Sequence, residues 1–84
     1  MVMSLTSHQV DLYVRILEVG ASRGVFHLAG ESRLIAENLV ALEDAYGLYM
    51  TEGYGLPAET AISRVMGYAA LATGVEARHL ALLA

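Results

Sequence analysis

The stretch from residue 31 to residue 52 constrains the fold most, because it carries an apolar pattern that suits a long packed helix. One row recurs at alternating spacings of four and three residues and consists of Ile35, Leu39, Leu42, Tyr46 and Tyr49. This spacing follows one side of an α-helix. A second row with the same rhythm lies on an adjoining side and consists of Leu34, Asn38, Ala41, Ala45 and Leu48. The combined arc is too wide for one small helix to cover, so we expect a further packing partner.

The composition supports the same expectation. The chain has 84 residues, enough for a single domain, and it contains no cysteine that could form a disulfide or a thiolate metal site. Its hydrophobic content is 56% and its mean hydropathy is +0.50. A chain of this size leaves much of its surface exposed, so spare apolar surface of this kind favours association with another chain.

Charge and hydropathy argue against two classes of partner. The formal net charge is −4, there is no lysine, and the five arginines are scattered along the chain. Direct nucleic-acid binding needs a concentrated basic patch, so we do not expect it. The apolar run over residues 65–75 is far shorter than the ~20 residues that span a bilayer. The N-terminus also lacks a basic segment followed by an apolar core, so we expect a cytoplasmic protein without a membrane partner.

The first helix is expected over residues 6–23. Thr6 and Gln9 have the spacing of a capping box, which predicts that the helix begins there. Asp11 and Arg15 are four residues apart, a favourable spacing for an ion pair on a solvent-facing side. Gly20 is expected to weaken the last turns, by about 1 kcal/mol relative to alanine. The short connector after the helix is apolar, and its Phe26 is expected to fill the core between the first two helices.

The second and third helices are expected over residues 31–52 and 57–73. Gly47 interrupts the second helix, and a glycine there usually marks the close approach of another backbone. Pro57 suits the first turn of the third helix, and Gly74 suits its end. A short fourth helix is expected over residues 76–83. Since no strand pattern is present, the sequence predicts an all-α fold with one domain.

No set of residues predicts catalysis, a metal or a cofactor. Residues 53–58 match a Gly-x-Gly-x-x-Ala pattern, but a helix rather than a strand precedes them, so they are expected to form a turn between helices. Glu76 and His79 have the spacing of a di-iron ligand pair, yet the chain lacks the second pair that such a site needs. Glu43 and Asp44 form an acid pair that could face a ligand, although the middle of a helix more often presents such residues to solvent. We therefore expect a protein that is not an enzyme.

The order of these motifs resembles the C-terminal regulatory domain of TetR-type bacterial transcription regulators. The resemblance covers residues 12–74 and rests on residues 16–26, on residues 36–48 with the sequence AENLVALEDAYGL, and on residues 68–74 with the sequence YAALATG. The chain differs from the family at Ala45, since the family commonly has glycine directly after the aspartate, whereas here the glycine is Gly47.

The resemblance implies a homodimer. In the family, the two last helices pair with their copies in a four-helix bundle, and an effector pocket lies beside them. For this chain the expected dimer interface comprises Leu42, Tyr46, Gly47, Tyr49, Ile62, Val65, Met66 and Ala69. The expected pocket for a small apolar effector comprises Tyr13, Leu17, Phe26 and Asn38. No counterpart of the family's DNA-binding domain precedes Leu12, so we do not expect the chain to bind operator DNA by itself.

A different class of function also fits these residues. The wide apolar arc over residues 31–52 would equally suit a stand-alone helical module that binds an unrelated protein. The hypothesis that the chain is a small helical enzyme or metal protein is the least favoured of the three. The dimeric regulatory domain predicts a stable homodimer, whereas the stand-alone module predicts a monomer that binds other chains.

Overall fold

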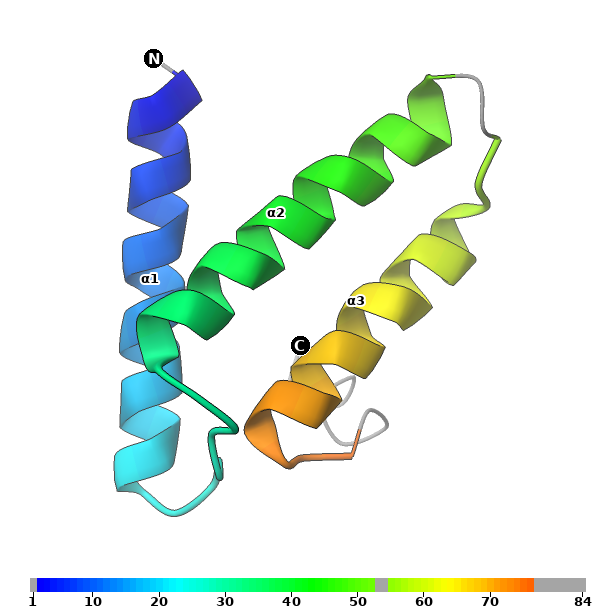
Figure 1. Cartoon of the computed structure of the whole chain (residues 1–84). Coiled ribbons are helices and arrows are strands. Elements are labelled where there is room, and N and C mark those ends of the chain that lie inside the picture. Colours follow the sequence, from blue (N-terminus) through cyan, green and yellow to red (C-terminus); the bar gives the residue numbers. More distant parts are fainter. Residues whose placement is uncertain (1, 53–54, 77–84) are drawn as a thin grey trace.

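The computed structural model describes residues 2–52 and 55–76. It contains three helices, α1 (Val2–Ser22), α2 (Ser32–Thr51) and α3 (Ala58–Thr73), and no strand among these residues (Figure 1). The prediction of an all-α fold is therefore confirmed. The helix expected over residues 76–83 lies outside the described residues except for Glu76, which is not helical.

The start of α1 differs from the prediction. The helix begins at Val2, so Thr6 lies inside the helix and not at its first residue. A capping box works only where the preceding residues leave the helical conformation. Residues 2–5 include neither glycine nor proline, so nothing in this segment interrupts the helix. By contrast, α2 and α3 begin and end within one residue of the expected bounds.

The contact between α1 and α2 contains most of the core. Val10 and Leu17 of α1 are buried against Ile35, Ala36 and Val40 of α2. The exposed fraction of Ala36 is 0%, and its small side chain leaves room for the two helices to come close.

Polar side-chain contacts border this helix pair. The Arg33 guanidinium donates to Asp11 Oδ1 at 2.9 Å, and the Ser32 hydroxyl donates to Glu18 Oε2 at 2.9 Å. The acids of α1 thus face α2. The expected pair between Asp11 and Arg15 is wrong, because Asp11 pairs with Arg33 of the neighbouring helix instead.

The second helix pair consists of α2 and α3, which run antiparallel (Figure 1). Ala61 and Ala72 are the buried apolar residues of α3, and the Asn38 side-chain amide of α2 donates to the Tyr68 hydroxyl at 3.1 Å. The end of α3 is also joined to the connector between α1 and α2. The backbone N–H groups of His27 and Ala29 donate to the carbonyls of Thr73 and Ala72, each at 2.8 Å.

The last turns of α1 are shaped by Gly20 and Phe26. The N–H of Phe26 donates to the Gly20 carbonyl at 3.1 Å, and the Phe26 ring packs back over the glycine. A Cβ at residue 20 would lie only 2.9 Å from Phe26 Cγ, and other ring atoms would be closer still. Gly20 was expected to be a weak point of the helix, whereas its missing side chain makes room for the ring. The expectation that Phe26 contributes to the core holds, since it packs against the buried cluster.

Gly47 is not approached by any other part of the described chain. A Cβ at this position would find no atom of another segment within 4 Å. The close backbone contact expected at Gly47 is therefore absent within one chain.

The fold is open for its length. Its radius of gyration is 13.2 Å, compared with about 12 Å for a compact domain of this size, and its shortest dimension is 19 Å. Both α1 and α3 pack on α2 but hardly touch each other. On α2, the second apolar row stays open to solvent, with Leu34 and Leu48 54% and 55% exposed. None of the helices in the described part of the chain is both long and apolar enough to cross a membrane.

Candidate ligand cleft and association surfaces

A cleft lies between α1 and α3, and α2 contributes to its wall. Its volume is about 280 Å³, and it is lined by Tyr13, Ile16, Leu17, Phe26, Leu39, Met66, Ala69 and Thr73. We call it the α1–α3 cleft. The cleft exists because α1 and α3 both pack on α2 without packing on each other. The facing side chains of the two helices therefore leave space between them.

The lining of the α1–α3 cleft is almost entirely apolar. Its two hydroxyl groups already have partners within the protein. The Tyr13 hydroxyl donates to the Glu43 carboxylate, with distances of 2.9 and 3.0 Å to the two oxygens, and the Thr73 hydroxyl donates to the Ala69 carbonyl at 2.7 Å. Neither hydroxyl is left in need of a ligand's polar group. The cleft therefore suits an apolar molecule, and its volume is near the lower end of ligand pockets, which begin at about 300 Å³.

The Tyr13 phenol stays protonated over a wide pH range. Partial burial, the hydrogen bond to Glu43 and the negative charge of that carboxylate together raise its pKa from 10.0 to about 12, and burial is the largest of the three causes. Each cause disfavours the charged phenolate. At neutral pH the phenol is thus a hydrogen-bond donor that connects α1 to α2 at the edge of the cleft.

Three of the four residues predicted for an effector pocket meet in this cleft. Tyr13, Leu17 and Phe26 all line it, whereas Asn38 does not. Asn38 points to α3, where it donates to Tyr68. It directly precedes Leu39 in α2, and one residue turns the side chain by about 100° around a helix. This rotation carries Asn38 away from the space that Leu39 lines.

The eight residues predicted for a dimer interface divide between two environments. Met66 and Ala69 line the α1–α3 cleft. The others lie along α2 and α3 and none is fully buried: Leu42, Tyr46, Gly47, Tyr49, Ile62 and Val65. Ile62 is 62% exposed, and the rings of Tyr46 and Tyr49 meet edge to face with centroids 5.7 Å apart. These residues remain accessible to a second chain, and their role in a dimer stays a prediction.

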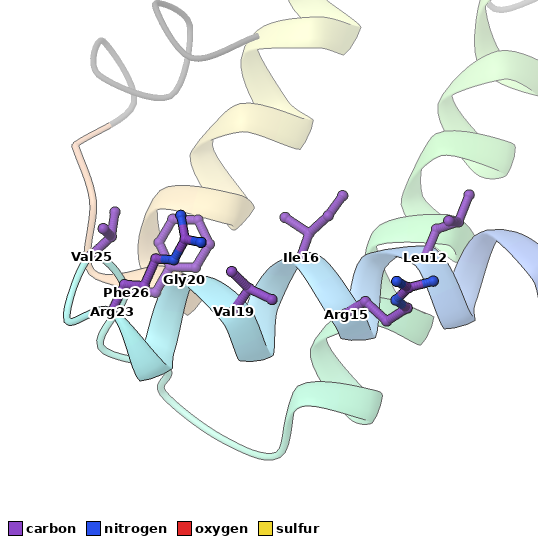
Figure 2. Close-up of a pocket in the computed structure, with 8 residues that line it drawn as sticks. All are labelled: Leu12, Arg15, Ile16, Val19, Gly20, Arg23, Val25 and Phe26. Atoms are coloured by element: carbon purple, nitrogen blue, oxygen red, sulfur yellow. The ribbon is translucent and has the colours of Figure 1, made fainter.

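A further apolar surface was not predicted from the sequence. It lies along α1 and the turn that follows it and consists of Leu12, Ile16, Val19 and Val25, which are 44% to 57% exposed. We call it the α1 outer stripe. Of these residues, Ile16 also lines the α1–α3 cleft. Figure 2 shows these side chains along the helix and the turn that follows it, together with Arg15, Arg23 and Phe26. The spacing of Leu12, Ile16 and Val19 was the available signal, since it repeats the four-then-three rhythm of α2.

The described residues bring together no metal site. Within residues 2–52 and 55–76, no group of three or more His, Asp or Glu side chains could hold an ion. Of the pair of Glu76 and His79, His79 lies outside the described residues. Of the acid pair on α2, Glu43 accepts from Tyr13, and Asp44 is exposed.

Comparison of the chain with protein-family models, with curated proteins and with solved structures found no match. The TetR resemblance therefore rests on the motifs in the sequence alone.

Proposed function

We propose that the chain is a dimerisation and effector-responsive domain of a TetR-type bacterial transcription regulator. The observation that carries the proposal is the openness of the single chain. It leaves an apolar cleft between α1 and α3 and an accessible apolar side on the pair of α2 and α3. Soluble chains seldom leave surface of this kind uncovered.

In this proposal a second copy covers the accessible side of α2 and α3. Ile62 is the most exposed residue of the predicted interface, and it lies on the same helix as Met66 and Ala69. The partner chain would bring its own α2 and α3, so that four helices surround a shared core. Gly47 would then have its close neighbour in the other chain, since the described part of its own chain supplies none.

The effector in this proposal is a small apolar molecule in the α1–α3 cleft. Met66 and Ala69 belong both to the cleft lining and to the predicted interface helix, α3. A molecule held against them would favour one position of α3 over others. Through that helix, effector binding and dimerisation would affect each other reciprocally.

Sedimentation analysis of purified variants tests the dimer. We expect the wild-type chain to sediment as a dimer, and Ile62→Glu and Gly47→Leu to shift it toward the monomer at equal concentration. A buried charge without a partner disfavours the dimer of Ile62→Glu, and overpacking disfavours the dimer of Gly47→Leu. Within the described part of one chain a Cβ at residue 47 meets no atom within 4 Å, so an effect of Gly47→Leu on mass would come from a second chain.

Leu71→Glu is the matched control. Leu71 is 81% exposed on α3 and lies outside the predicted interface, so its replacement should leave the sedimentation coefficient unchanged. Circular dichroism should give equal helix content for all variants. A wild-type chain that stays monomeric at every concentration would contradict the proposal. It would favour the alternative, a stand-alone helical module that binds a different protein.

A further inference from the structure

The α1 outer stripe forms the floor of an open groove of about 530 Å³ (Figure 2). Gly20 and Phe26 form the end of the groove at the turn after α1. Since the lining otherwise comes from one helix and its following turn, the groove is elongated along the helix axis. A partner that follows the axis of α1 would therefore make more contact than a compact ligand.

The charges around this groove have one sign. Arg15 and Arg23 line it, and neither forms an ion pair with any residue that the structure describes. The two acids of α1 that precede and follow Arg15 are engaged elsewhere, since Asp11 pairs with Arg33 and Glu18 accepts from Ser32. Two unpaired guanidinium groups thus flank apolar side chains in a chain whose net charge is −4.

We propose that the α1 outer stripe docks an acidic amphipathic helix of another protein. Such a helix would place apolar side chains on Leu12, Ile16 and Val19. Arg15 and Arg23 are eight residues apart, which corresponds to about 12 Å along a helix. Glutamate or aspartate residues about two turns apart on the partner would therefore reach both guanidinium groups, each of which can bind a carboxylate through two hydrogen bonds.

Charge argues for such a partner over a second copy of this chain. A second α1 laid on the same stripe would bring its own Arg15 and Arg23 to the groove, while its Asp11 and Glu18 would remain engaged with its own α2. Like charges would then face each other, which is unfavourable. A bilayer is also a poor match, because two arginines contribute only about 1 kcal/mol each toward an anionic surface and the chain as a whole is acidic.

Fluorescence anisotropy with two synthetic peptides tests this inference. Both peptides have leucine at the a and d positions of each heptad, and the flanking positions carry glutamate in one peptide and lysine in the other. We expect the glutamate peptide to bind the wild-type chain and the lysine peptide to bind about tenfold more weakly. The double variant Arg15→Glu and Arg23→Glu should reverse this preference. Arg64→Glu, an exposed change on α3, is the charge-matched control and should leave the preference as in the wild type.

A second variant separates the stripe from the dimer. Val19→Glu should weaken the binding of the glutamate peptide by about tenfold, while the sedimentation coefficient should stay that of the wild type. Three outcomes would overturn the inference: equal binding of both peptides to the wild type, a change of oligomeric mass in Val19→Glu, or binding to phosphatidylglycerol-containing vesicles in place of the peptide. Because the readout is peptide binding, its failure is distinguishable from a failure of the proposed dimer.

Discussion

Gly20 and Phe26 together determine how α1 ends. The carbonyl of Gly20 accepts the N–H groups of Val25 and Phe26, and the Phe26 ring occupies the space where a side chain at residue 20 would lie. Phe26 is predictable as a core residue, because a large apolar side chain in a short connector is rarely left in water. The role of Gly20 is not predictable from the sequence, because its contact with the Phe26 ring forms only once the chain has turned.

Gly20→Ala should destabilise the protein, although alanine is the better helix former. The new Cβ would overlap with the partly buried Phe26 ring, and we expect the displacement to lower the free energy of unfolding by about 1–2 kcal/mol. Gly67→Ala on α3 is the control, since its Cβ meets open space and should be neutral or stabilise by up to about 1 kcal/mol. Urea denaturation measures both. A gain in stability for Gly20→Ala would contradict the role assigned to the ring.

Tyr13 makes the stability of the fold sensitive to pH in the alkaline range. Its pKa is about 12 in the folded chain and 10.0 as a free side chain, so the unfolded chain releases the phenolic proton first. The free energy of unfolding should therefore fall as the pH rises from 10 toward 12. We expect a loss of about 1 kcal/mol, less than the pKa shift alone would give, because the phenol is partly exposed to solvent that screens it.

Tyr13→Phe isolates this contribution. The variant cannot ionise at residue 13, so the wild-type chain should lose more stability than the variant over the same pH range in urea denaturation. Glu43→Gln provides a second comparison, because it removes the negative charge near the phenol and should lower the pKa of Tyr13 in a titration followed by tyrosinate absorbance. A stability difference between wild type and Tyr13→Phe that does not change with pH would contradict the assignment.

At the scale of elements, local signals predicted most of the helix bounds. Gly74 adopts a φ of 74° at the end of α3 and Pro57 directly precedes its start, so these residues act within their own segments. One error, the start of α1, arose within its own segment, because residues 2–5 continue the helix. The error in the partner of Asp11 arose because a residue of the neighbouring helix pairs with it. Asp11 has a candidate partner in its own helix, Arg15, yet it pairs with Arg33 of α2. A rule about residue spacing along one helix does not take account of the helix beside it.

The α1–α3 cleft arises from how the three helices pack together. Ala69→Phe should fill it, because residue 69 lines the cleft and a benzyl group would occupy much of its volume of about 280 Å³. We expect the variant to bind the apolar dye N-phenylnaphthylamine about tenfold more weakly in a fluorescence titration. Ala41→Phe adds the same group at an exposed site on α2 and serves as the control. Equal dye binding by both variants would exclude the cleft as the binding site.

At the scale of the whole molecule, the sequence predicted that some apolar surface would remain exposed. It left undecided which row of α2 would form that surface. Both rows of α2 have the same rhythm, but Ile35 of the first row is buried while Leu34 and Leu48 of the second are exposed. The direction that each row faces depends on where α1 and α3 sit. The positions of the neighbouring helices also explain which of the predicted pocket residues meet in the α1–α3 cleft. Tyr13, Leu17 and Phe26 line one cleft, whereas Asn38 faces α3, because a residue's neighbours depend on its position around the helix and on where the other helices sit.

The two hydrogen bonds from the connector to the end of α3 have a consequence for the order of folding. His27 and Ala29 are joined to Thr73 and Ala72, which lie more than half the length of the chain away. Contacts between such distant residues are entropically costly until the intervening segment is ordered, whereas α1 with α2 and α2 with α3 are sequence neighbours that can pair early. We therefore expect these two hydrogen bonds to form last, after both helix pairs have formed.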